Sequence, residues 1–236
     1  MKFDTPLLRG TLVKRYKRFL ADVTLDSGET ITVHCPNTGT MLSCSAPGSM
    51  VGLSVSYNPK RKYPHTLEMV RVGNNWVGVN TARTNKLVAE AVEQGRIDEF
   101  QDVHRIKSEV KTSSHTRLDL QIFHGESTTY VEIKNCSLAQ NHCAMFPDAV
   151  TARGTKHLQE LARLCREGSR ACIFFLVQRA DADRFAPASH IDPVYSMELS
   201  AASAAGVMVL AYQARVSPEA INIYRQLPVE LDQAAR

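Results

Sequence analysis

The stretch RLDLQIFHGESTTYVEIKNCSL, residues 117–138, decides how the chain is predicted to fold. Two runs of alternating apolar and polar residues flank a polar turn, and such alternation is typical of β-strands because successive side chains point to opposite faces. Apolar residues recur from Leu118 to Ile122 in the first run, and at Val131 and Ile133 in the second. The turn, residues 124–127, contains a glycine that can adopt a positive φ. The stretch therefore predicts two strands joined as a hairpin.

The polar faces of these two strands carry charged residues that could act together. Asp119 lies on the first strand, and Glu132 and Lys134 lie on the second. If the strands pair, the three side chains converge on one side of the sheet. Hard divalent cations prefer carboxylate oxygens, and an ammonium group stabilises negative charge on a phosphate. The hairpin thus carries a candidate metal site able to polarise a phosphodiester.

The composition describes an ordinary folded protein with an uneven charge distribution. The chain has 236 residues, 44% hydrophobic and 22% charged, enough for one large domain or two small ones. Residues 1–83 carry 11 Lys or Arg and 5 Asp or Glu, a net charge of +6, whereas residues 84–236 carry 17 and 19, a net of −2. A basic first third indicates an anionic partner, of which nucleic acid is the commonest.

Other sequence features concern the cellular compartment. The six cysteines form no CxxC pair, and the first ten residues contain no apolar segment of the kind that signal peptides have. No run of about 18 apolar residues, the length that crosses a membrane, is present. We therefore expect a cytoplasmic protein with reduced cysteines and no membrane partner.

Residues 11–80 are predicted to be all-β. Strand candidates fall at residues 11–25, 29–35 and 48–58, and two more lie within residues 65–81 around Asn74-Asn75. Five short strands separated by turn signals in about 80 residues predict an OB-like barrel, a fold that commonly binds oligonucleotides. We assign residues 1–82 to this domain.

Two basic clusters in the predicted barrel each have an aromatic neighbour. Lys and Arg contact phosphates, and an adjacent ring can stack on an unpaired base. A solvated strand face is the alternative interpretation. The candidate nucleic-acid contacts are Lys14, Arg15, Lys17, Arg18, Lys60, Arg61 and Lys62, with His34 and Asn37 on the same surface.

The pattern changes from Asn80 onward to alternating helices and strands. A helix is predicted in residues 80–97, ending at Gly95, and an edge strand in residues 104–114 precedes the hairpin. A second helix is capped by Thr151 and ends at Gly168. Residues 171–178 form a continuous apolar run, which predicts a strand covered on both faces. A third helix within residues 195–206 and a buried strand at 207–216 complete an α/β domain with a mixed sheet, residues 83–236.

This order of elements resembles the PD-(D/E)xK nuclease core, and Asp119 with Glu132-Ile133-Lys134 fits that superfamily's motif. The resemblance places the hairpin at the edge of a nuclease-like sheet. It implies that Asp119, Glu132 and Lys134 are catalytic and that the two carboxylates ligate Mg²⁺ or Mn²⁺. Glu90 or Glu109 would complete the metal shell, with Glu90 favoured by its place on the first helix.

A second resemblance covers nearly the whole chain. The segments RYKRFLADV, HCPNTGTM, PKRKYPHTLE, SEVK, RLDL, VEIKN, FPDAVTARGTKHL and HID are similar to the bacterial sugar fermentation stimulation protein A family. The family resemblance implies an N-terminal OB-like barrel followed by a nuclease-like α/β domain, DNA binding, and a regulatory link to sugar use, maltose in particular. Relatives usually read Ser-Arg-Ile-Asp-Phe where this chain has residues 116–120, TRLDL, so the arginine and aspartate are kept.

Two functions remain open at this stage. The first is a metal-dependent nuclease in which Arg153, Lys156 and His157 of the crossover helix also meet the phosphate. The second is a DNA-binding regulator without catalysis, in which the charged cluster is structural. DNA is the expected partner, with RNA left open, and binding should tolerate sequence because no helix-turn-helix or zinc-finger pattern is visible. The oligomeric state is also left open, a dimer included.

Overall fold

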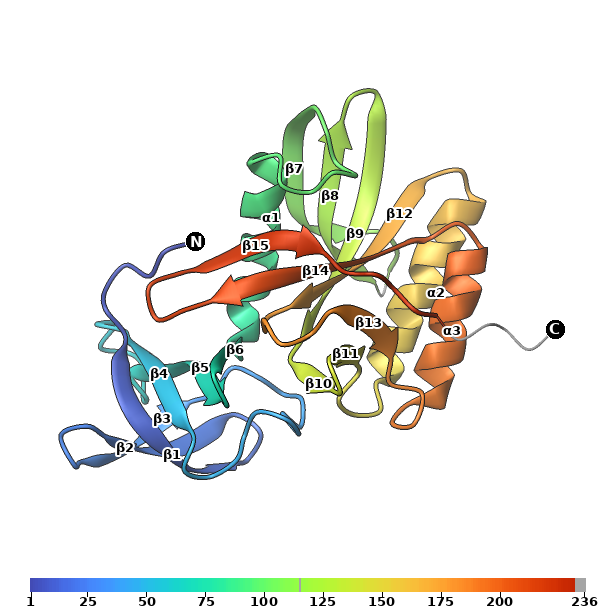
Figure 1. Cartoon of the computed structure of the whole chain (residues 1–236). Coiled ribbons are helices and arrows are strands. Elements are labelled where there is room, and N and C mark those ends of the chain that lie inside the picture. Colours follow the sequence, from blue (N-terminus) through green and yellow to red (C-terminus); the bar gives the residue numbers. More distant parts are fainter. Residues whose placement is uncertain (115, 232–236) are drawn as a thin grey trace.

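The computed structural model describes residues 1–114 and 116–231. Figure 1 shows the first six strands gathered in one lobe and the rest of the chain arranged around a second sheet, which also has six strands.

The first lobe is a barrel. Its strands run in the order β3-β2-β1-β4-β5-β6, and a parallel contact between His34 and Thr66 joins β3 to β5. This contact closes β1 to β5 into a barrel, and β6 extends the sheet beyond β5. The interior is filled by buried aliphatic side chains such as Leu12, Val33 and Leu67. The strand bounds are Leu8–Tyr16 (β1), Leu20–Leu25 (β2), Thr30–His34 (β3), Met50–Val55 (β4), His65–Val72 (β5) and Asn75–Gly78 (β6). The predicted OB-like barrel is confirmed.

The second lobe contains three α-helices and nine strands in the described residues. Its elements are a 3₁₀ turn η1 (Thr81–Arg83), α1 (Thr84–Glu93), β7 (Val103–Lys111), β8 (Arg117–His124), β9 (Ser127–Cys136), β10 (Leu138–Gln140), β11 (Cys143–Phe146), α2 (Ala152–Arg166), β12 (Arg170–Val177), β13 (Arg184–Pro187), α3 (Pro193–Ala204), β14 (Met208–Val216) and β15 (Ile221–Gln226). This lobe is an α/β domain, as predicted.

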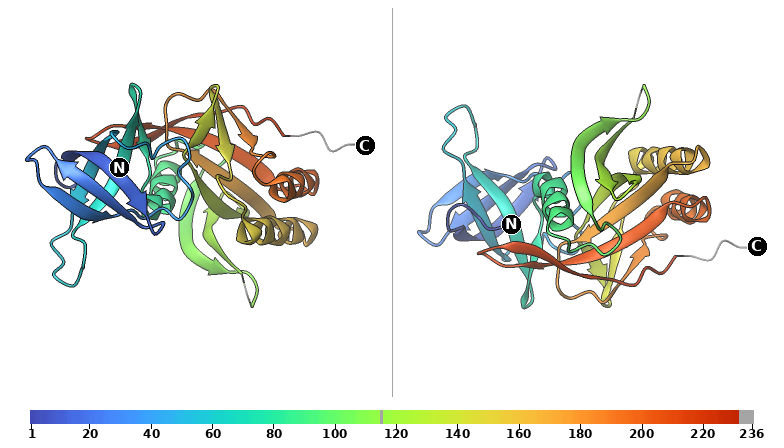
Figure 2. Two further views of the ribbon diagram at one scale, coloured as in Figure 1. Left: turned by 90° about the horizontal axis from the view of Figure 1, so that it is seen from below. Right: turned by 90° about the horizontal axis from the view of Figure 1, so that it is seen from above.

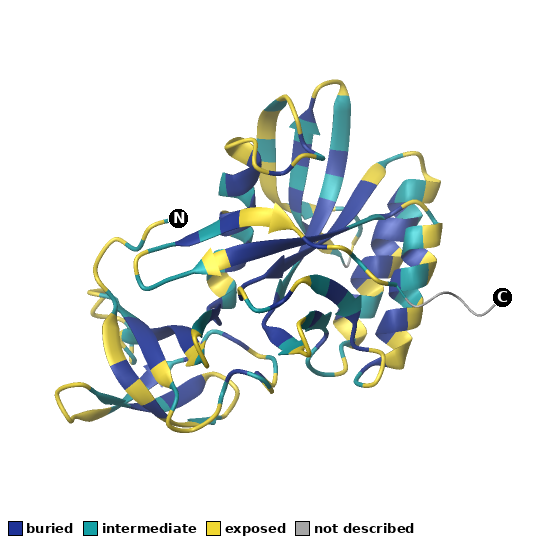
Figure 3. Cartoon of the chain, viewed as in Figure 1, coloured by how far each residue is buried: buried dark blue, intermediate teal, exposed yellow. Residues whose placement is uncertain are grey.

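The main sheet of this domain lies between two helical layers. Its strand order is β15-β14-β12-β9-β8-β7, and β9, β12 and β14 are parallel. Figure 2 shows α2 and α3 side by side on one side of the sheet and α1 on the other, toward the barrel. Along β12, Ile173 and Phe175 pack beneath α2 and α3, whereas Cys172 and Phe174 pack with α1. The continuous apolar run is thus a strand covered on both faces, and Figure 3 shows it as buried.

The stretch that decides the fold forms the β8–β9 hairpin. His124 pairs with Ser127 across the turn, where Gly125 has a φ of +49°. The prediction that this hairpin forms the edge of the sheet is wrong. The α2 crossover brings β12 alongside β9, and β7 pairs with β8, so both hairpin strands lie inside the sheet and β7 is the edge.

The predicted start of the second helix and the predicted ends of the first two helices agree with the described structure. The Thr151 side chain accepts a hydrogen bond from the Gly154 amide at the start of α2. Gly168 and Gly95, with φ values of +87° and +65°, follow the ends of α2 and α1. Both glycines adopt the left-handed conformation that terminates helices.

Several features were not predicted. A small sheet, β10-β11-β13, and the last strand, β15, were missed. The first residues, which the sequence assigned to the barrel, contact the second domain instead: the Met1 ammonium donates to the Ile221 carbonyl at 2.9 Å, and Lys2 pairs with Ala220.

All six cysteines are free thiols. Among the described residues, every helix falls short of the length and apolar character that a membrane-crossing segment requires.

Candidate functional site

The candidate site lies where β8 and β9 separate. Backbone pairing between the two strands runs from the turn to Leu120 and Val131. Beyond this pair a side chain replaces the backbone as hydrogen-bond acceptor: Oδ2 of Asp119 accepts a hydrogen bond from the backbone amide of Ile133 at 2.7 Å. A carboxylate is therefore held between two diverging strands.

A second hydrogen bond fixes the same carboxylate from helix α1. Oδ1 of Asp119 accepts it from the side-chain amide of Asn85, in the first turn of α1, at 2.8 Å. Burial raises the pKa of Asp119, and the negative charge of Glu132 raises it further, although the two donors oppose these effects. The site thus brings two carboxylates close enough to repel each other.

Glu132 is the most buried charged group of the site, with 3% of the residue exposed. Its Oε1 accepts from the Lys134 ammonium at 2.5 Å and from His157 of α2. Burial alone would raise the pKa of Glu132, but the His157 hydrogen bond and the Lys134 charge lower it below its ordinary value. The other oxygen, Oε2, is buried and has no hydrogen-bond partner among the described residues.

His157 holds Glu132 in place. Its Nε2 accepts from Arg153 Nε at 3.4 Å, which assigns the ring proton to Nδ1, the nitrogen that faces Glu132. The ring is buried between the helix and the sheet. The sequence predicted His157 as a phosphate contact, and in the structure its buried side chain is hydrogen-bonded to the Glu132 carboxylate.

The two candidates for a third carboxylate lie elsewhere. Glu90 forms an ion pair with the Met1 ammonium at 3.1 Å, and Asn85, on a different face of the same helix, reaches Asp119 instead. Glu109 is exposed on β7 and pairs with Arg117 at 3.6 Å. Within residues 1–114 and 116–231, no three His, Cys, Asp or Glu side chains are grouped so as to hold a metal ion.

Two predicted nucleic-acid contacts of the barrel have internal roles. The Arg15 guanidinium donates to the carbonyls of Arg18, Asn37 and Gly39 at 2.6–2.7 Å, and to that of Thr40 at 3.2 Å. Asn37 is buried, and its side chain bonds Gly39 and the Val79 carbonyl. Both residues therefore shape the loop of residues 37–40, which we call the barrel loop.

The remaining predicted contacts of the β1–β2 hairpin differ in exposure. Lys14 pairs with Asp22 at 3.6 Å and lies over the Tyr16 ring. Lys17 and Arg18 occupy the turn with φ values of +49° and +62°, and both are exposed. Lys17 and Arg18 are therefore accessible to a phosphate group of a nucleic acid.

The second basic cluster lies in the loop before β5. Lys60 and Lys62 are exposed, and Lys62 lies over the Tyr63 ring. Arg61 donates to Thr66 at 2.9 Å, next to His34, whose pKa is lowered by burial and by the Arg61 charge. Lys156 is exposed on α2.

The barrel loop is joined to the second domain by residues that the sequence did not single out. Thr40 Oγ1 donates to the Asp148 carbonyl at 2.7 Å, and the Met41 amide donates to the Asp148 carboxylate at 2.9 Å. A Cβ at Gly39 would lie 2.5 Å from that carboxylate. The HCPNTGTM and FPD segments thus touch, and Gly39 is required for their close approach.

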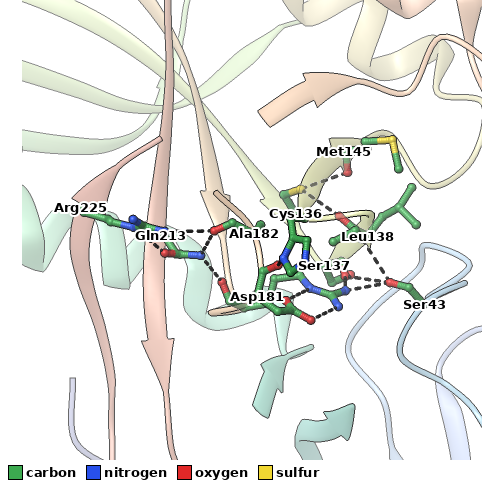
Figure 4. Close-up of polar contacts among 12 residues, drawn as sticks. Ser43, Cys136, Ser137, Leu138, Met145, Asp181, Ala182, Gln213 and Arg225 are labelled. Atoms are coloured by element: carbon green, nitrogen blue, oxygen red, sulfur yellow. Dashed lines mark hydrogen bonds and ion pairs between the residues drawn. The ribbon is translucent and has the colours of Figure 1, made fainter. Parts of the chain in front are cut away.

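A second joint lies beside this one. Arg179, buried after β12, pairs with Asp181 and donates to the Ser137 carbonyl at 2.6 Å and to Ser43 Oγ of the barrel at 2.9 Å. Figure 4 shows Ser43 directed toward Ser137 across the boundary. The buried side-chain amide of Gln213 donates hydrogen bonds to the carbonyls of Arg179 and Ala182 at 2.9 and 2.6 Å. The two joints fix the barrel against the α/β domain.

Between the barrel loop and the α/β domain lies a cleft of about 670 Å³. Its walls come from the barrel loop, the start of α1, the end of β9 and the segment before α2. Lys134 and Asn85 line the cleft, so it opens directly beside Asp119 and Glu132.

The fold and site define a two-domain protein, in which a small β-barrel is fixed against an α/β domain with an Asp–Glu–Lys cluster at the opening of its central hairpin. Residues 13–79 match the family model described as the SfsA N-terminal OB domain, and residues 82–220 match the sugar fermentation stimulation protein RE domain. The chain belongs to the sugar fermentation stimulation protein family.

Individual relatives cover almost the entire chain. The sugar fermentation stimulation protein homolog of Desulfotalea psychrophila is 54% identical over 98% of this chain and 96% of its own length. The homolog of Pelobacter propionicus is 51% identical over 96% and 98%. The solved structure of Pyrococcus furiosus SfsA in complex with Ca²⁺ is similar with a TM-score of 0.90 at 26% identity, covering 98% of both chains.

Proposed function

We propose that the protein is a divalent-metal-dependent nuclease. The observation that carries this proposal is the pairing of Asp119 and Glu132 across the point where β8 and β9 separate, with Lys134 bonded to Glu132 at 2.5 Å. Two carboxylates and an ammonium in this arrangement can bind a cation and act on the negative charge of a phosphodiester.

The residues present fit Mg²⁺ or Mn²⁺. Mg²⁺ keeps several waters and is usually held by one or two carboxylates together with substrate phosphates, so a third acidic ligand is not required. The buried Oε2 of Glu132 has no partner among the described residues. A cation would favour the ionised form of Asp119, whose pKa is raised by burial and by the negative charge of Glu132. The Ca²⁺ complex of the Pyrococcus furiosus relative supports divalent-cation binding in this family.

When bound, the metal would polarise the scissile phosphate and lower the pKa of a bound water. Asp119, fixed by Asn85 and the Ile133 amide, and Glu132, fixed by His157, would hold it. Lys134 would orient the attacking water or stabilise charge on the phosphate. Arg153 stands at the start of α2, where it supports His157 and can meet an adjacent phosphate.

DNA is the proposed substrate, with RNA left open. The exposed cations of the barrel, Lys17, Arg18, Lys60 and Lys62, would attract the sugar-phosphate backbone. Such contacts recognise the charge of the phosphates and not the base sequence. The DNA affinity should therefore depend little on the base sequence and should fall as the salt concentration rises.

A cleavage assay tests the nuclease directly. Wild type, Glu132→Ala and the control Glu126→Ala, an exposed residue in the hairpin turn, are incubated with labelled single- and double-stranded DNA and RNA plus Mg²⁺ or Mn²⁺. We expect cleavage by wild type and by the control, and its loss in Glu132→Ala. If all three proteins are inactive while their DNA binding is equal, the nuclease proposal fails.

A second candidate function is a non-catalytic DNA-binding regulator of sugar metabolism, maltose included. It is favoured by one observation: Lys134 and His157 both occupy Oε1 of Glu132, forming a closed ion cluster of the kind that stabilises a fold. Under this alternative, Glu132→Ala lowers the melting temperature, and no protein variant cleaves nucleic acid with any metal.

A further inference from the structure

The nuclease proposal assigns no role to the cleft beside the candidate site. Lys134 is bonded to Glu132 and also lines the cleft, and Asn85 is bonded to Asp119 and also lines it. A molecule in the cleft therefore lies next to the groups that would hold the metal. The opposite wall is the barrel loop, which belongs to the OB domain.

Hydrogen bonds at both ends hold the barrel loop, the opposite wall of the cleft, in place. Arg15 donates to carbonyls along the loop, and Thr40 and Met41 at the end of the loop donate to Asp148. The close approach of Gly39 to Asp148 leaves no space for a side chain between the two segments. Opening the cleft widely would break these bonds together, so the size of the cleft limits which molecules enter.

The size of the cleft disfavours a duplex. Its volume of about 670 Å³ is far too small to enclose B-DNA, whose major groove alone is about 12 Å wide and 8.5 Å deep. The volume falls instead in the range of about 300–1,000 Å³ that encloses one small organic ligand. One or two nucleotides of a single strand match this size.

The lining also suits a single strand. Arg18 and Lys134 supply positive charge for phosphates, and the hydroxyl and amide groups of the walls, such as those of Thr84 and Asn85, can bond sugar and base edges. Val150 is 76% exposed on the segment before α2 and offers an apolar contact for a base face.

We propose that the cleft binds single-stranded nucleic acid, with its phosphates toward Arg18 and Lys134, and excludes the duplex. This inference rests on the proposed nuclease function, because the strand held here is the one presented to Asp119 and Glu132. DNA and RNA strands share the chemistry that the cleft recognises, and the experiment treats them separately.

Fluorescence polarisation tests the proposal with the full chain. The probes are labelled single strands of DNA and of RNA and the matching blunt DNA duplex. Each single strand is about 12 nucleotides long, which lies within the range of single-strand lengths that an OB fold binds. EDTA is present, so binding is measured without metal-dependent cleavage. We expect a single strand of at least one type to bind roughly tenfold tighter than the duplex.

A substitution that fills the cleft provides the matched comparison. Val150→Trp adds bulk at an exposed cleft position, and Val194→Trp adds the same bulk at a 62% exposed position at the start of α3, outside the cleft. We expect Val150→Trp to weaken single-strand binding roughly tenfold and Val194→Trp to leave it unchanged. Equal melting temperatures for the two variants establish that both fold.

A charge reversal supplies a second, independent variant. Arg18→Glu in the cleft should weaken single-strand binding strongly, whereas Arg166→Glu, exposed at the far end of α2, should not. The proposal is overturned if duplex and single strands bind equally, or if Val150→Trp and Arg18→Glu bind single strands as wild type does. Selective single-strand binding without any cleavage in Mg²⁺ or Mn²⁺ would support the cleft and refute the nuclease.

Discussion

Replacing Glu68 with alanine should destabilise the protein more than any surface substitution, because this residue connects the two domains. Glu68 lies on β5 and is 1% exposed. Its carboxylate accepts from Ser54 at 2.6 Å, from Asn80 at 2.9 Å, and from Arg83 through two nitrogens at 2.6 and 2.8 Å. Asn80 caps the 3₁₀ turn and Arg83 precedes α1, so one barrel carboxylate fixes the start of the helix that carries Asn85.

The magnitude follows from this geometry. Removing one partner of a buried ion pair costs about 3–5 kcal/mol, because the remaining charge stays buried and unpaired. Arg83 keeps 27% of its side chain exposed, which places the cost toward the lower end of this range. Each kcal/mol shifts the melting temperature by about 2–4 °C in a protein of this size, so we expect Glu68→Ala to melt roughly 6–20 °C lower. Glu68→Gln retains the hydrogen-bond acceptor and loses only the charge, which predicts an intermediate loss.

Thermal unfolding followed by circular dichroism measures the effect. Glu29→Ala, an exposed carboxylate in the β2–β3 turn, is the matched control and should change the stability by less than about 0.5 kcal/mol. If Glu68→Ala melts within about 2 °C of wild type, the ion pair with Arg83 does not connect the domains as argued.

Three further substitutions test other parts of the account. Gly39→Val should lower stability by about 1–3 kcal/mol, since its side chain would collide with the Asp148 carboxylate; a wild-type melting temperature would contradict this. Asp119 has a raised pKa in the fold, so its contribution to stability falls as pH rises through its unfolded value of about 3.9 and stays reduced at pH 7. Asp119→Asn should therefore melt higher than wild type at pH 7 in EDTA, and the gap should narrow toward pH 4; a lower melting temperature at pH 7 would argue against charge repulsion. Lys134→Met should slow metal-dependent cleavage roughly 10²–10³-fold with little change in DNA affinity, and equal losses of both would assign Lys134 to binding alone.

The barrel and the β8–β9 hairpin could be predicted because their patterns are local. Alternation along residues 117–124 gives the observed burial pattern of β8, and turn signals every ten residues or so mark the barrel strands. The strands β10, β11 and β13 have only three or four residues each, too few for alternation to be distinguished from a loop. The position of the hairpin inside the sheet depends on β7 and β12, and no local pattern of the hairpin itself contains that information.

The candidate site was partly accessible from the sequence. Asp119, Glu132 and Lys134 follow from strand periodicity, and the structure brings them together as predicted. Asn85 has no motif of its own, and choosing between it and Glu90 requires knowing which face of α1 meets β8.

The predicted nucleic-acid contacts illustrate a different limit. The sequence predicts that an arginine side chain will bind an anionic group or donate hydrogen bonds to carbonyl oxygens. It does not predict which of these two interactions forms. Arg15 and Arg18 are three residues apart in one basic cluster, yet Arg15 is occupied by the carbonyls of the barrel loop and Arg18 is exposed beside the cleft.

The central claim is that Asp119 and Glu132 form a divalent-cation site, and calorimetric titration with Mn²⁺ tests it most directly. We predict one binding event for the wild-type protein and at least about tenfold weaker binding for Glu132→Gln, with Glu126→Gln binding as wild type does. The absence of Mn²⁺ binding by the wild type, or equal binding by Glu132→Gln, would contradict the account.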